Sequence, residues 1–93
     1  MAYRMLRPRF PRGRIFAPPG ALALGVDLAP YLRRPPCGDW GEELCGEDRE
    51  ANESALRCGA RILSCYRTPA GDRLYIITEW DRSMTTVMLP SEY

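Results

Sequence analysis

The chain reads Ile76-Ile-Thr-Glu-Trp-Asp-Arg-Ser-Met-Thr-Thr-Val-Met-Leu-Pro-Ser-Glu-Tyr93, and in it two runs of β-branched and apolar residues flank a charged turn. Such residues are typical of strands. Side chains alternate between the two faces of a sheet, so Ile76 and Thr78 fall on one face and Ile77 on the other. The segment therefore predicts two strands joined at Asp81-Arg82-Ser83.

A third strand is predicted just before these two. Residues 61–67 and 74–80 both alternate with a period of two, and the connection Thr68-Pro-Ala-Gly-Asp72 places proline and glycine where a short hairpin turn needs them. With residues 84–89, these strands predict an antiparallel meander. Residues 14–17 are a candidate for a short additional strand.

The acidic segment 42–59 is the strongest helix candidate. Apolar side chains recur in it at helical spacing and a glycine follows as a stop, at Leu44, Ala51, Ala55, Cys58 and Gly59. Short helices are predicted over 21–24 and over 28–34, the second capped by Asp27. We therefore expect an α+β fold, with a three- to four-stranded antiparallel sheet packed by one main helix plus short N-terminal helices.

The length of 93 residues predicts a single domain, which we place at residues 15–93. Residues 1–14 are predicted to be a flexible arm, since they contain prolines, no acidic residue and no helical period. The arm carries the arginines Arg4, Arg7, Arg9, Arg12 and Arg14. It is either a loose extension or a phosphate-binding segment, in which case affinity for nucleic acid would depend strongly on salt.

Cysteine and histidine usage argues against a metal site. The chain has four cysteines without a close Cys-x-x-Cys pair, and it has no histidine. We expect reduced thiols, no metal and no cofactor. The apolar run 15–26 is interrupted by Pro18-Pro19-Gly20 and is shorter than a membrane span. We therefore expect a cytoplasmic protein without a membrane partner.

The sequence does not predict an enzyme. Without histidine there is no Ser-His or Cys-His pair, and neither a Gly-x-Gly-x-x-Gly motif nor a phosphate-binding loop that ends in Lys-Ser/Thr occurs.

The candidate partner-binding residues are Trp40, Trp80, Asp81 and Arg82, because tryptophan and arginine dominate protein interfaces. Each residue also has a structural interpretation. Trp40, which stands near two glycines, can be a core residue. Asp81 can accept hydrogen bonds from the amides of Ser83 or Met84, and Arg82 can reach an acid such as Glu79.

Several motifs are spread over residues 38–93. They include Gly38-Asp-Trp-Gly41, Glu47-Asp-Arg-Glu-Ala-Asn52, Arg61-Ile-Leu-Ser64, Ile76-Ile-Thr-Glu79, Asp81-Arg-Ser83 and Glu92-Tyr93. In this pattern the chain resembles a family of small proteins common on bacterial plasmids and integrative elements. Its members are often described as plasmid-related proteins or mislabelled as modification subunits of type I restriction enzymes. The resemblance implies a gene that lies among anti-restriction and anti-CRISPR genes.

The restriction-enzyme label does not fit this chain as an activity. An adenine methyltransferase needs a full doubly wound domain and an Asn-Pro-Pro-aromatic motif, whereas this chain is far shorter and offers only Arg34-Pro-Pro-Cys37. We therefore expect a non-catalytic protein-binding module from a mobile element. Its partner would be a host defence complex or nuclease, which it would inhibit. The alternative is a small nucleic-acid-binding regulator that uses the arginine-rich arm.

Overall fold

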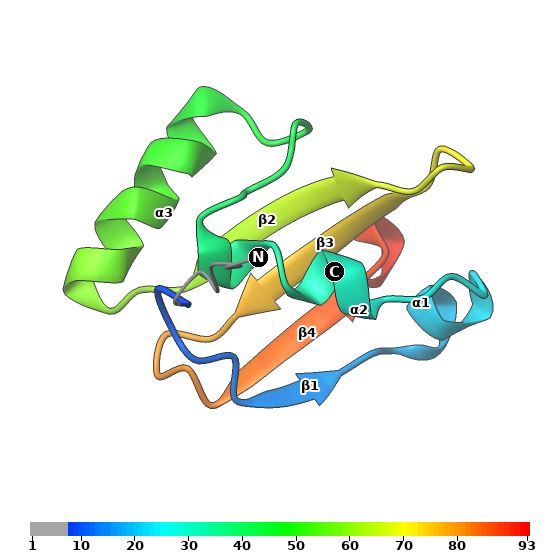
Figure 1. Cartoon of the computed structure of the whole chain (residues 1–93), viewed down its shortest axis with the longest axis horizontal. Coiled ribbons are helices and arrows are strands. Elements are labelled where there is room, and N and C mark those ends of the chain that lie inside the picture. The colour runs from blue at the N-terminus through cyan, green and yellow to red at the C-terminus, as the bar shows by residue number, and fades with distance from the viewer. Residues whose placement is uncertain (1–7) are drawn as a thin grey trace, which may run out of the picture.

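The structure of the protein is a computed structural model that describes residues 8–93. One four-stranded sheet and one main helix dominate it (Figure 1), which confirms the predicted α+β class. The elements are β1 (Arg14–Phe16), α1 (Pro19–Ala23), α2 (Ala29–Leu32), η1 (Pro35–Cys37), α3 (Gly46–Cys58), β2 (Ile62–Arg67), β3 (Arg73–Thr78), β4 (Met84–Met88) and η2 (Pro90–Glu92).

The strands lie in the order β1-β4-β3-β2. The pairs β2–β3 and β3–β4 are antiparallel, as the predicted meander requires. Strand β1, however, runs parallel to β4, with Arg14 beside Met84. The sheet is therefore mixed, and the prediction of a purely antiparallel sheet is wrong at this strand. A hairpin turn would have forced an antiparallel pair, but a long connection separates β1 from β4 and permits the parallel one.

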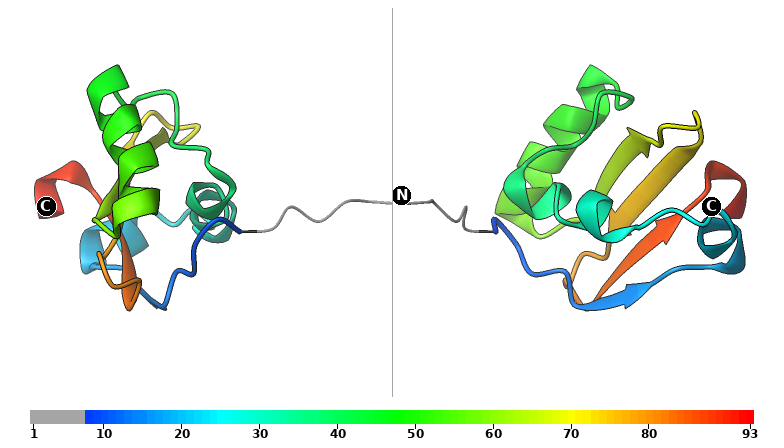
Figure 2. Two further views of the ribbon diagram at one scale, coloured as in Figure 1. Left: turned by 90° about the vertical axis from the view of Figure 1, so that its left-hand side faces the viewer. Right: turned by 45° about the vertical axis from the view of Figure 1, so that its right-hand side comes forward.

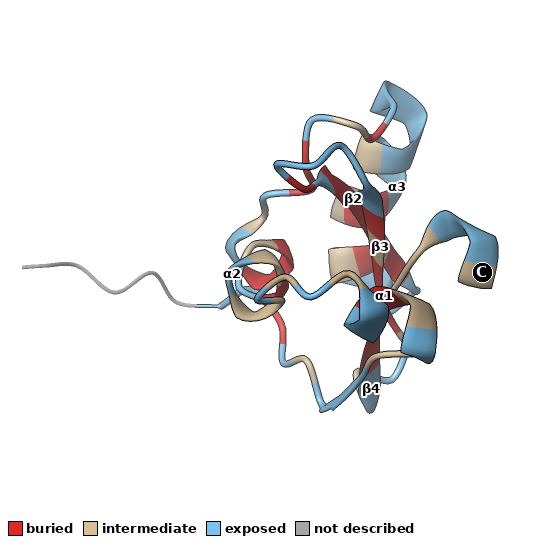
Figure 3. Ribbon diagram, turned by 90° about the vertical axis from the view of Figure 1, so that its right-hand side faces the viewer, coloured by how far each residue is buried: buried red, intermediate tan, exposed pale blue. Residues whose placement is uncertain are grey.

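Different elements cover the two faces of the sheet. Helix α2 lies over one face, where Leu32 packs with buried side chains of all three meander strands, namely Tyr66, Leu74, Ile76 and Val87. Element η2 lies over the other face, as the side views show (Figures 2 and 3). There Tyr93 meets Tyr75 edge to face, with 5.9 Å between the ring centroids.

Helix α3 lies along the β2 edge of the sheet (Figures 1 and 2). Its buried Asn52 accepts a hydrogen bond from the Leu63 amide at 3.0 Å and donates one to the Leu63 carbonyl. Further along β2, the Cys65 amide donates to the Trp40 carbonyl at 3.1 Å. Gly41 makes this approach possible, because a Cβ at this position would lie 1.9 Å from the Cys65 carbonyl oxygen. Three outward backbone groups of β2, those of Leu63 and the Cys65 amide, thus find partners within the domain.

The Gly38-Asp-Trp-Gly41 motif is held in place by its own aspartate. The carboxylate of Asp39 accepts hydrogen bonds from Arg34 at 2.6 Å and from the Gly41 amide at 3.1 Å. Chiefly through the Arg34 bond, these contacts hold the pKa of Asp39 below its ordinary value. The carbonyl of Asp39 also accepts the hydroxyl of the buried Tyr66. These contacts give Asp39, the aspartate of this motif, a structural role within the domain.

We predict that Asn52→Ala lowers the free energy of unfolding by about 2 kcal/mol, because it leaves two partly buried backbone groups of Leu63 without partners. Urea unfolding followed by circular dichroism measures this loss. Ser54→Ala is the matched control, since Ser54 is an exposed residue of the same helix and its substitution should change stability little. Equal stability of the Asn52→Ala variant and the wild type would contradict the role given to Asn52.

Candidate protein-binding site

The turn between β3 and β4 is fixed from both sides, first by Asp81. The Asp81 carboxylate accepts hydrogen bonds from the Ser83 amide at 3.0 Å and from the Ser83 hydroxyl at 2.6 Å. This confirms the expected bond to the Ser83 amide. The bonds from Ser83 also hold the pKa of Asp81 below its ordinary value. A turn without glycine is stabilised in this way by a local side-chain contact.

Arg82 fixes the turn from the other side. Among residues 8–93 it is the only non-glycine residue with positive φ, at 60°. Its guanidinium donates to the carbonyls of Ala60 at 2.6 Å, Glu79 at 3.0 Å and Ala55 at 3.1 Å. Ala55 belongs to the last turn of α3, where carbonyls carry partial negative charge, and its carbonyl also accepts the Gly59 amide at 2.9 Å. The Arg82 guanidinium thus binds the backbone carbonyl of Glu79, and the expected contact with the Glu79 carboxylate does not form.

The Arg82 side chain also lies over Phe10, which in turn stacks on Trp40. Its guanidinium lies 5.6 Å from the centroid of the Phe10 ring, and Phe10 stacks on Trp40 with 6.4 Å between centroids. Phe10 and Trp40 are 6% and 3% exposed and belong to the same core cluster. Trp40 therefore presents almost no surface to a partner. Its environment supports the structural interpretation of this residue.

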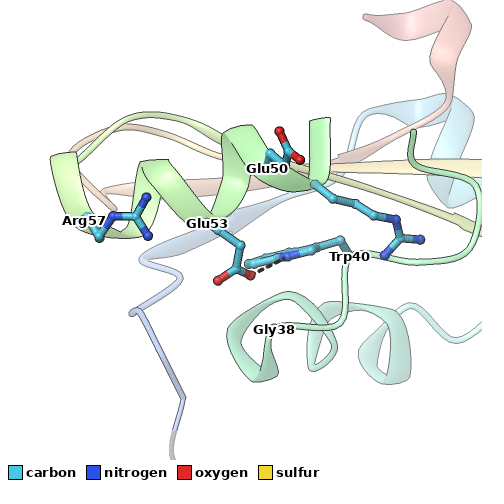
Figure 4. Close-up of a pocket in the computed structure, with 6 residues that line it drawn as sticks. Gly38, Trp40, Glu50, Glu53 and Arg57 are labelled. Carbon is cyan, nitrogen blue, oxygen red and sulfur yellow. Dashed lines mark hydrogen bonds between the residues drawn. The ribbon is translucent and has the colours of Figure 1, made fainter. Parts of the chain in front are cut away.

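A shallow groove of about 520 Å³ runs beside Trp40, between α3 and Gly38 (Figure 4). The Trp40 indole donates to Glu53 at 2.9 Å, and Arg9 forms an ion pair with the same carboxylate at 2.8 Å. Arg9, followed by Trp40, holds the pKa of Glu53 below its ordinary value. Arg49, which also lines the groove, donates to the carbonyls of Leu44 and Gly41. Trp40, Glu53 and Arg49, which line the groove, are therefore engaged within the domain.

The described part of the predicted arm, residues 8–14, packs against the domain. The Arg9 amide donates to the Pro36 carbonyl at 2.6 Å, and Arg12 donates to the Leu32 carbonyl at 3.1 Å. A Cβ at Gly13 would lie 2.3 Å from the Ser83 carbonyl oxygen, so the chain passes directly over the β3–β4 turn. Of the five arginines predicted to bind nucleic acid, Arg4 and Arg7 lie outside the described residues, and Arg14 is exposed in β1.

Trp80 is the large apolar residue among the predicted site residues that remains accessible, and Asp81 beside it is also exposed. It follows β3 and begins the fixed turn, with 67% of its surface exposed. The structure thus brings Trp80, Asp81 and Arg82 together on one turn. Trp40 is instead buried in the core and does not share their surface. Sequence reasoning missed Phe10, because a single aromatic residue between Arg9 and Pro11 gives no periodic signal.

Other features of the described residues add no further site. In residues 8–93 no group of three or more His, Cys, Asp or Glu side chains is placed to hold a metal ion. Cys37, Cys45 and Cys58 are free and exposed, and Cys65 is free and buried. Within the same residues, no helix has the length and apolar character needed to cross a membrane.

No protein family, curated protein or solved structure matches this chain. The resemblance to plasmid and mobile-element proteins therefore stays a prediction.

We predict that Arg82→Ala lowers the free energy of unfolding by about 2 kcal/mol, because three carbonyls lose their charged donor. Arg82→Gly should be more stable than Arg82→Ala by about 1 kcal/mol, since glycine tolerates the positive φ at this position. Urea unfolding of both variants tests the two effects separately. Arg57→Ala, which removes an exposed arginine of α3, is the control, and an Arg82→Ala variant as stable as it would contradict the prediction.

We predict that the stabilisation due to Glu53 disappears in acid. Its pKa is lowered in the folded state, so its contribution is present above the ordinary glutamate pKa of about 4.3 and is lost as the pH falls through the folded value. Glu53→Gln lacks this contribution at every pH. Urea unfolding should therefore show a difference between wild type and variant at neutral pH that decreases as the pH is lowered below about 4.3. Glu50→Gln on the same helix is the control, and a pH-independent difference for Glu53→Gln would contradict the prediction.

Proposed function

We propose that the protein is a non-catalytic protein-binding module whose anchor is Trp80. The observation that carries the proposal is a tryptophan that is 67% exposed on a turn fixed by its neighbours. Tryptophan is among the residues that contribute most to binding energy at interfaces, because a large ring can be buried in a pocket of the partner.

The fixed turn increases the affinity that Trp80 can provide. Binding costs free energy when loops and side chains become ordered at an interface. Asp81 and Arg82 have already ordered this turn, through Ser83 on one side and the end of α3 on the other. In this proposal Trp80 contacts the partner, whereas Asp81 and Arg82 position it. Trp40 has no direct role in binding, because it is 3% exposed.

The resemblance to mobile-element proteins supplies the class of partner. It points to a host defence complex or nuclease in the cytoplasm, which the protein would inhibit by occupying a surface, as anti-CRISPR and anti-restriction proteins do. Such inhibition requires binding alone and no chemistry.

The alternative, binding of nucleic acid by the arginine-rich arm, has less support from the described residues. Arg9 forms an ion pair with the Glu53 carboxylate at 2.8 Å, and Arg12 donates to the Leu32 carbonyl. Both arginines would have to give up these partners in order to bind phosphate. Protein binding through Trp80 needs no such rearrangement.

We predict that Trp80→Ala reduces capture of the partner at least about tenfold, since loss of an interface tryptophan often costs 2 kcal/mol or more. The experiment is affinity capture from a bacterial host with active CRISPR and restriction systems, with quantitative mass spectrometry of the co-purified proteins. Leu22→Ala is the matched control, because Leu22 is 62% exposed but lies on α1. Equal capture by Trp80→Ala and wild type, with both proteins folded, would refute the site. Capture of nucleic acid alone would favour the alternative.

A further inference from the structure

We propose that two copies of this chain pair through β1, antiparallel to each other about a twofold axis at Ile15, so that their two four-stranded sheets join into one. This proposal goes beyond the binding of a partner by Trp80 and does not depend on it. It rests on the backbone groups, side chains and register of β1.

The outer edge of β1 has backbone groups available for pairing. Arg14 faces β4, since its amide donates to the Ser83 carbonyl at 2.9 Å. Successive residues of a strand direct their backbone groups to opposite sides, so the amide and carbonyl of Ile15 face away from β4. Within residues 8–93, no loop backbone pairs with them. In Figure 1 no element is drawn beyond β1 on this side of the sheet.

The two edges of the sheet differ in how far other parts of the chain cover them. At the β2 edge, Asn52 binds the backbone of Leu63, and the Trp40 carbonyl accepts the Cys65 amide. At the β1 edge, Ile15 and Phe16 are instead 45% and 53% exposed. Open edges with apolar side chains invite pairing with another strand, and proteins usually protect them. The exposed apolar side chains at Ile15 and Phe16 therefore make this edge available for pairing.

The register of β1 favours a second copy as that occupant. With Ile15 opposite itself, the two Ile15 residues exchange both of their outward hydrogen bonds. Arg14 then lies opposite Phe16 of the second copy on one face, and symmetry forms this contact twice. An arginine beside an aromatic ring is an attractive cross-strand pair. Within residues 8–93, Arg14 has no ion pair that would compete with it.

The opposite strand direction is disfavoured by charge. A parallel pair of β1 strands in register would place Arg14 opposite Arg14, and like charges directly opposite each other destabilise a sheet. Strand β1 has only three residues, so the pair relies on its side chains as well as its backbone. Because small interfaces are weak, we expect a dissociation constant on the order of micromolar.

Charge substitutions on the full chain test both the pairing and its direction. Sedimentation equilibrium of the wild type between about 1 and 500 µM should show a monomer–dimer equilibrium. Phe16→Arg places two arginines opposite each other and Arg14→Glu places a carboxylate opposite a ring. Each change should raise the dissociation constant at least about tenfold, since two contacts are lost per dimer. The double variant R14E/F16R should regain the dimer, because each carboxylate then faces an arginine of the other copy.

Several results would overturn the proposal. A wild type that stays monomeric to 500 µM, or a Phe16→Arg variant that dimerises as the wild type does, would exclude pairing at β1. Failure of R14E/F16R to regain the dimer would exclude the antiparallel register. Both side chains are exposed in β1, so the variants should fold, and cooperative urea unfolding of each one verifies this. A variant that does not unfold cooperatively is replaced by Phe16→Lys or Arg14→Asp, for which the same outcomes apply.

Discussion

The three hydrogen bonds from the Arg82 guanidinium to backbone carbonyls join the parts of this protein that are far apart in sequence. They connect Ala55 in the last turn of α3, and Ala60 just after this helix, to the β3–β4 turn at Glu79. A guanidinium suits this position because it offers several donors in a fixed plane and stays charged. The same group lies over Phe10 and thereby holds the N-terminal segment against the core. The favourable contacts offset the strain of a positive φ.

The position of α3 explains why one edge of the sheet is open. In many small α+β domains the main helix covers a face of the sheet, whereas here α3 closes the β2 edge through Asn52. The faces are left to short elements, α2 on one side and η2 on the other (Figure 3). No helix remains for the β1 edge among the described residues. The two surfaces that we propose for binding lie at β1 and at the turn that follows β3.

Much of the fold could be predicted from local patterns, because its strongest elements are local. The period of two gave the meander, helical spacing and Gly59 gave α3, and the short-range bond from Asp81 to Ser83 followed from turn chemistry. Contacts between distant segments could not be predicted in this way. Neither the parallel direction of β1 nor the burial of Phe10 leaves a signal in the neighbouring residues. In the candidate site, residue type alone singles out Trp80, and its role stays a prediction, whereas the binding of Arg82 to helix carbonyls depends on where α3 ends in space.

The two exposed features lie close together, and this proximity bears on how the protein would act. The Arg14 amide bonds to the Ser83 carbonyl, so β1 and the Trp80 turn are joined directly. A twofold axis at Ile15 would place the two Trp80 turns at opposite ends of the paired strands, each held by its own Arg82. Two identical anchors on one rigid body bind a symmetric or repetitive partner more tightly than one anchor does, because the second contact becomes intramolecular. Pairing of β1 would thus turn a weak single-residue anchor into a selective one, directed at assemblies that repeat the same pocket.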